Sequence, residues 1–139
     1  GLDAPGNFRL LKKWVKSPYP LPFGMVKNKR SIISINNLVS FIMLAIEHQN
    51  ASNQLFLISD AQPISTKVLV NEMIGINRGL LKNLLIPNFI LVFMLTILNK
   101  KNLINKLLGS IEIDISKSKS ILGWEPPFDT YNEIKKAML

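Results

Sequence analysis

The sequence predicts a single α/β domain over residues 1–139, in which small helices alternate with strands too few and too short for a sheet-dominated core. Three observations support this prediction. The composition, 47% apolar and 19% charged, is that of a chain that buries a core. Several runs carry apolar residues at helical spacing. Between these runs lie short apolar stretches bounded by Gly, Pro or Asn, which are too brief to be helices.

Capping residues and apolar periodicity predict the helices in order along the chain. The first covers 8–16 with Asn7 as its cap, and Pro18 and Pro20 end it because proline removes a backbone donor. The others are expected from 36 or 37 to about 49, from 68 to 76 after the cap Ser65, from 88 to 98, over 103–108, from the cap Ser116 to 122, and from the cap Asp129 to 138.

Short strands are predicted at 21–23, 32–35, 55–58, 84–86 and 111–115. The loop between the first two is basic, because it carries Lys27, Lys29 and Arg30. An apolar edge beside clustered cations suits a ligand with a flat ring at one end and phosphate at the other, since a guanidinium binds phosphate through two parallel hydrogen bonds. The alternative is a hairpin whose loop is basic without binding anything.

The stretch from Asn88 to Leu98 is uncharged and strongly apolar. It is shorter than the roughly 18 to 20 residues needed to span a bilayer, so no transmembrane span is expected. We expect a helix that is buried or faces a partner, with shallow membrane contact as the alternative.

The net charge of +8 raises the question of nucleic acid binding. Fourteen of the 17 cations are lysines, and they are scattered without a long basic run or interleaved aromatic residues, so no nucleic acid partner is expected. The chain has no cysteine, which excludes disulfides and thiolate metal sites and suits a reducing cytoplasm.

The sequence contains no arrangement that predicts catalysis. It has no glycine-rich phosphate loop after a strand, and neither His48 nor the acidic residues have metal-ligand spacing. Asp60, Glu112 and Asp114 are interpreted as caps or solvated carboxylates. Tyr131 is followed by a lysine four residues later, but the pair falls in the last helix, after every strand, and is interpreted as a coincidence. No catalytic residue and no metal site is therefore predicted.

Several short motifs, taken in order, resemble the C-terminal substrate-binding portion of extended short-chain dehydrogenases. Within that group the chain looks most similar to the UDP-glucose 4-epimerase-like NAD-dependent epimerase/dehydratase proteins of bacterial polysaccharide pathways. The motifs are Gly6-Asn-Phe8, Leu21-Pro-Phe-Gly24, Lys29-Arg-Ser-Ile-Ile-Ser-Ile35, Ser59-Asp60 and the stretch from Gly109 through Leu122-Gly-Trp-Glu-Pro-Pro127.

The resemblance implies a role for five positions of this chain in binding a UDP-sugar. Asn7 matches an asparagine whose amide contacts the diphosphate, and Arg30 matches an arginine that binds it. Leu21 and Phe23 match a strand whose backbone contacts the uracil. Lys106 stands where relatives usually have a second phosphate-binding arginine, so the charge is kept and the planar fork is lost.

The resemblance also implies what this chain lacks. In the family, the nucleotide-binding Rossmann half that holds NAD, and the residues that move the hydride and proton, precede this stretch. We therefore expect a fragment or truncated product that binds a UDP-sugar but is inactive alone, with a dimer expected only for a full-length parent. The alternatives are part of a 4-keto reductase or dehydratase, or a non-catalytic remnant or interaction domain.

Overall fold

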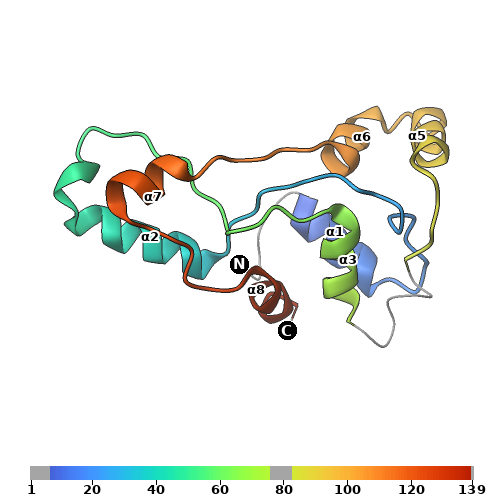
Figure 1. Ribbon diagram of the computed structural model, residues 1–139. Coiled ribbons are helices and arrows are strands. Elements are labelled where there is room, and N and C mark those ends of the chain that lie inside the picture. Colours follow the sequence, from blue (N-terminus) through green and yellow to red (C-terminus); the bar gives the residue numbers. More distant parts are fainter. Residues whose placement is uncertain (1–6, 76–82, 139) are drawn as a thin grey trace.

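The computed structural model describes residues 7–75 and 83–138, and the part of the chain that it describes is helical (Figure 1). Helices form in all the predicted regions, with ends within about three residues of those expected. They are α1 (Asn7–Lys16), α2 (Ile35–Glu47), the 3₁₀ helix η1 (Gln49–Ala51), α3 (Thr66–Ile74), α5 (Asn88–Ile97), α6 (Lys101–Leu108), α7 (Ser116–Leu122) and α8 (Thr130–Lys136). The stretch Gly1-Leu-Asp-Ala-Pro-Gly6, whose composition predicts a loop, lies outside the described residues.

Two of the predicted helix caps are confirmed. The Ser65 hydroxyl accepts a hydrogen bond from the backbone N–H of Val68, and the Asp129 carboxylate accepts one from Asn132. These bonds satisfy N–H groups that have no partner within the helix.

The predicted start of α2 at residue 36 or 37 and the predicted cap Ser116 of α7 were wrong. The cap of α2 is Ser34, whose hydroxyl accepts from the backbone N–H of Asn37 at 3.1 Å, so the helix begins before Asn36. Ser116 is the first residue of α7 and not its cap. Its N–H donates to the carboxylate of Asp114 two residues earlier, which turns the chain into the helix.

The predicted strands do not form among the described residues. Backbone pairing there is limited to isolated bridges, Leu21 with Asn83, and Arg30 with both Ile64 and Ile111. A strand ladder needs consecutive pairs, and these extended segments separate after one. The apolar stretches are non-helical except at Ile35, which begins α2, and periodicity does not tell whether a partner strand runs alongside.

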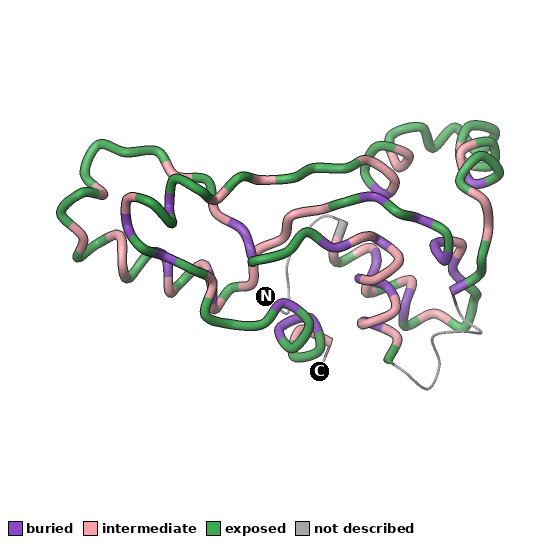
Figure 2. Tube along the Cα trace, viewed as in Figure 1, coloured by how far each residue is buried: buried purple, intermediate pink, exposed green. Residues whose placement is uncertain are grey.

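The buried apolar residues form two clusters at opposite ends of the chain's long dimension (Figures 1 and 2). The larger gathers residues of α1, α3, α5, α6 and α8, with Val70 fully buried. The smaller lies between α2 and α7. There the rings of Phe41 and Trp124 pack edge-on, with 5.2 Å between their centroids. The extended segments run between the two.

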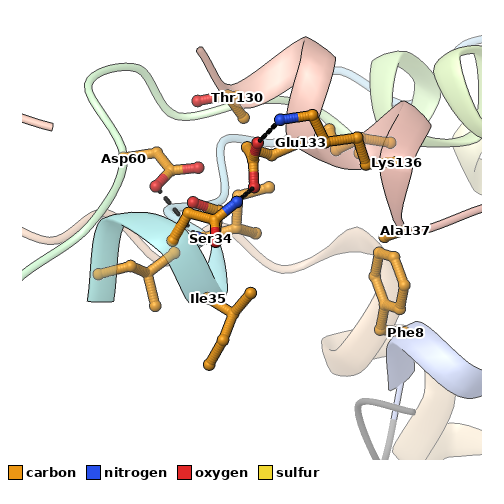
Figure 3. A pocket seen from close by; sticks show the side chains of 12 residues that line it. Phe8, Ser34, Ile35, Asp60, Thr130, Glu133, Lys136 and Ala137 are labelled. Carbon is orange, nitrogen blue, oxygen red and sulfur yellow. Dashed lines mark hydrogen bonds and ion pairs between the residues drawn. The ribbon is translucent and has the colours of Figure 1, made fainter. Parts of the chain in front are cut away.

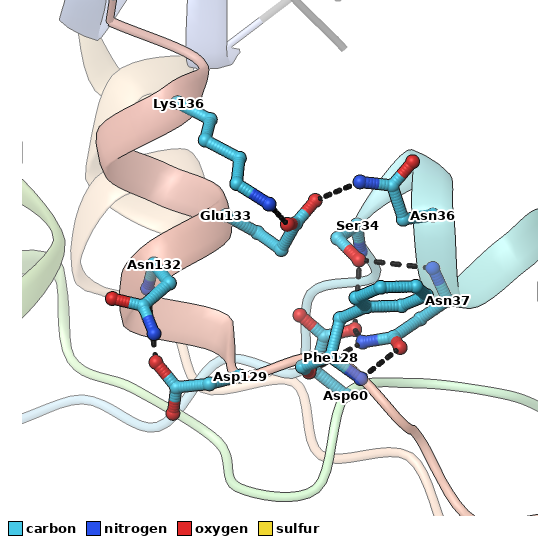
Figure 4. A network of polar contacts seen from close by, with 9 residues as sticks. All are labelled: Ser34, Asn36, Asn37, Asp60, Phe128, Asp129, Asn132, Glu133 and Lys136. Atoms are coloured by element: carbon cyan, nitrogen blue, oxygen red, sulfur yellow. Dashed lines mark hydrogen bonds and ion pairs between the residues drawn. The ribbon is translucent and has the colours of Figure 1, made fainter.

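The Asn37 side chain, at the start of α2, bonds to the segments at Asp60 and Phe128 (Figure 4). Its side-chain amide is completely buried and donates to Asp60 Oδ1 at 2.7 Å and to the carbonyl of Phe128 at 3.0 Å. Its Oδ1 accepts from the Phe128 N–H at 2.9 Å. The interpretation of Asp60 as solvated was wrong, because its side chain is buried and accepts from Asn37 and from the Ser34 N–H.

Candidate phosphate-binding site

Arg30 is held in place by backbone bonds on both sides. Its N–H donates to the carbonyl of Ile64 at 2.9 Å, and the Ile64 N–H donates back at 3.0 Å. On the other side, the Ile111 N–H donates to the carbonyl of Lys29, and the Ile111 carbonyl accepts from the Ser31 N–H, at 2.8 Å in each bond. A side chain on such a double bridge starts from a fixed backbone position.

The guanidinium of Arg30 reaches the C-terminal end of α6. Nη1 donates to the carbonyl of Lys106 at 2.7 Å and, more weakly, to that of Gly109 at 3.4 Å. A cation is favoured there, because the last carbonyls of a helix lack partners and carry partial negative charge. In the described part of the chain both bonds use Nη1, so the Nε and Nη2 donors stay available to a second acceptor.

Lys106 lies next to Arg30 in the structure. Its backbone carbonyl accepts from Arg30, and its side chain is exposed in the last turn of α6. Lys29 precedes Arg30 and forms an exposed ion pair with Glu112, with 3.5 Å between Nζ and Oε2. Exposed pairs of this kind are weak, so the positive charge of this region is only partly compensated.

Sequence reasoning missed two residues that position this end of α6. The buried Asn28 amide donates to the carbonyls of Leu107 and Gly109 at 3.1 and 3.0 Å. Its Oδ1 accepts from the N–H of Thr66, whose hydroxyl also donates to Leu107. The signal was the alternation from Val26 to Lys29, in which the even positions are buried and the lysines exposed.

Leu21 and Phe23 lie in the larger apolar cluster and are almost completely buried. Their backbone groups contact residues 83–84: Leu21 accepts from the N–H of Leu84, and the Phe23 N–H donates to the side chain of Asn83. The structure therefore brings together Arg30 and Lys106, whereas Leu21 and Phe23 contact a different segment. Asn7 is the first residue of α1, and its side chain lies outside the described part.

A separate hollow of about 430 Å³ lies between the starts of α1 and α2 and the α8 helix (Figure 3). It is mostly apolar, but Asp60 and Glu133 are among its lining residues. Glu133 accepts from Asn36 at 2.6 Å and pairs with Lys136 at 2.7 Å. Two carboxylates repel a diphosphate, so we place the phosphate-binding candidate at Arg30 and not in this hollow.

The spacing of Tyr131 and Lys135 in α8 is interpreted as a coincidence, because Lys135 has a structural partner. Lys135 pairs with Glu72 of α3, with 3.6 Å between charged atoms, and stabilises the packing of the two helices. His48 ends α2 and its ring nitrogen Nδ1 accepts from the N–H of Asn50. Among the described residues, no group of three or more His, Asp or Glu side chains could hold a metal ion.

Comparison with known proteins gives one informative relative. The chain is 38% identical over 129 residues, or 91% of its length, to a UDP-glucose 4-epimerase from Vibrio cholerae. The predicted family resemblance is confirmed. The chain spans 39% of that epimerase's length. No family model and no solved structure matches the chain.

Within residues 7–75 and 83–138, no helix is both long and apolar enough to cross a bilayer.

Proposed function

We propose that this chain is the UDP-sugar-binding part of an NAD-dependent, UDP-glucose 4-epimerase-like enzyme of nucleotide-sugar metabolism in the cytoplasm. Asn7, Arg30 and Lys106 contact the diphosphate, and the backbone around Leu21 and Phe23 contacts the uracil. The observation that carries the proposal is the 38% identity to the epimerase over nearly the whole chain.

The geometry supports the phosphate part of the proposal most strongly. The bridges to Ile64 and Ile111 fix the backbone of Arg30, and the end of α6 orients its guanidinium through Nη1. The remaining edge, Nε and Nη2, is the pair of donors that binds two phosphate oxygens in parallel. Lys106 adds a second cation on the same helix end. Pre-oriented donors of this kind lose little entropy on binding.

NAD would be held by a region outside these 139 residues. The described part offers it no glycine-rich turn between a strand and a helix, which is the usual place for its pyrophosphate. This chain would contribute substrate binding and positioning, and alone it would not convert the substrate.

Titration of UDP into the purified chain and the Arg30→Ala variant tests the proposal. Loss of a charge-assisted phosphate contact costs about 1.5 to 3 kcal/mol, so the affinity should fall about tenfold to a hundredfold. Lys13→Ala is the matched control, because Lys13 is an exposed cation on α1. Equal affinities for all three proteins would contradict the assignment of the diphosphate to Arg30.

A further inference from the structure

One face of α5 is apolar and uncovered. Phe89, Phe93 and Ile97 follow one another at four-residue spacing and are 74%, 65% and 67% exposed. On the opposite side of the helix Leu91 is 4% exposed and joins the larger apolar cluster. The helix is thus attached to the molecule by one side only, and Figure 2 shows most of it as exposed.

This apolar surface extends beyond the central stripe. Leu85, just before the helix, and Met94 and Leu98 within and after it are also exposed. No charged residue occurs from Asn83 to Asn99. We call six of the exposed apolar residues of this stretch the α5 patch: Leu85, Phe89, Phe93, Met94, Ile97 and Leu98.

The sequence on either side of the α5 patch carries charge of one sign. The 39 residues from Met73 to Ile111 contain five Lys or Arg and no Asp or Glu. Lys100 and Lys101 directly follow the patch and are exposed. Exposed apolar side chains beside lysines, with no acidic residue nearby in the sequence, suit an anionic membrane surface, where apolar groups enter the acyl boundary and cations meet lipid phosphates.

We propose that the α5 patch docks onto the surface of an anionic phospholipid bilayer. The ten-residue helix lies flat, the apolar side chains enter the boundary between headgroups and acyl chains, and Lys100 and Lys101 contact lipid phosphates. A second copy of the chain fits less well. A two-fold interface on the patch would bring two acid-free basic borders together, and like charges repel.

Vesicle co-sedimentation of the full chain tests the proposal. The probes are vesicles of phosphatidylcholine alone and of phosphatidylcholine with phosphatidylglycerol at a ratio of about 3 to 1. We expect binding to the mixed vesicles that weakens with salt. Phe93→Ser should weaken it at least about tenfold. The double variant Lys100→Gln/Lys101→Gln should weaken it about thirtyfold on the anionic vesicles.

Matched controls separate the α5 patch from general stickiness. Ile46→Ser removes an equally exposed apolar residue from α2, and Lys13→Gln/Lys16→Gln removes two exposed cations from α1. Both should bind mixed vesicles like the parent chain. Phe93→Trp keeps the patch apolar, and quenching of its emission by brominated acyl chains should report insertion even if the serine variant folds poorly.

Three results would overturn the proposal. One is no sedimentation of the folded chain with the anionic vesicles. Another is equal loss of binding in the control variants. The third is an oligomer in solution that Phe93→Ser dissociates while the parent chain ignores lipid, which would assign the patch to a second copy.

Discussion

Asn37 connects three segments that are distant in the sequence, the start of α2, the loop at Asp60 and the turn at Phe128. We expect Asn37→Ala to lower the free energy of unfolding by about 3 kcal/mol, because it removes three hydrogen bonds and leaves the buried Asp60 carboxylate with fewer donors. Urea unfolding followed by circular dichroism measures the change.

The control for Asn37 is Asn132→Ala. Asn132 is exposed in the first turn of α8, and its backbone N–H keeps the cap bond to Asp129 after the substitution. Its effect should stay within about 0.5 kcal/mol. A loss at Asn37 no larger than this would show that the buried amide does not stabilise the fold.

Asp114 offers a residue-scale prediction about pH. The hydrogen bonds from the Ser116 hydroxyl and N–H stabilise the carboxylate and hold the pKa of Asp114 below its ordinary value. The stabilisation is therefore complete above the ordinary pKa and is lost as the pH falls through the lowered one. Ser116→Ala should raise the pKa of Asp114, measured by NMR titration, and an unchanged value would refute this cause.

At the scale of elements, the contact between residues 21–24 and 83–84 replaces the expected strand pairing. A Cβ added at Gly24 would lie 2.6 Å from the carbonyl oxygen of Leu84, so the two backbones would have to separate. Gly24→Ala should cost about 2 kcal/mol of stability in thermal or urea unfolding. Met25→Ala, a change at its exposed neighbour, should cost much less, and equal losses would contradict this account.

The helices could be predicted from sequence because their signals are local. Ser65 and Asp129 bond to N–H groups three residues away, and Gly123 ends α7 in the left-handed conformation at φ +64°. The strands could not, since pairing depends on which distant segment runs alongside. Arg30 pairs with residues 34 and 81 positions later, and nothing in its own neighbourhood specifies either one.

Some residues of the candidate site could likewise be predicted from sequence, and others could not. The cations Arg30 and Lys106 could be predicted from type and resemblance, and the structure joins them through one hydrogen bond. The bonds of Asn28 and Thr66 could not be predicted, because both side chains reach the carbonyl of Leu107, which is distant in sequence. The alternation at 26–29 indicates only that Asn28 is buried.

At the scale of the whole molecule, the chain exposes more surface than its mass predicts. It has 9228 Å² of accessible surface, against about 7300 Å² for a compact monomer of 15.7 kDa. In the described part, twenty large apolar residues are exposed and fifteen apolar residues are buried. This excess is typical of a surface that a partner or another part of a protein covers.

We therefore expect the isolated chain to be marginally stable and prone to aggregate. Differential scanning calorimetry with light scattering should show a broad, weak transition followed by association. A sharp two-state transition of a purified monomer would contradict this prediction.

The most direct test of the central claim is to map UDP on the chain by NMR, following backbone amide and arginine side-chain signals during titration. Binding at the proposed site should shift the Arg30 guanidinium and the amides of residues 106–110, and leave the hollow at Asp60 and Glu133 unchanged. Shifts confined to that hollow, or none in a folded chain, would contradict the assignment of the diphosphate to Arg30 and Lys106.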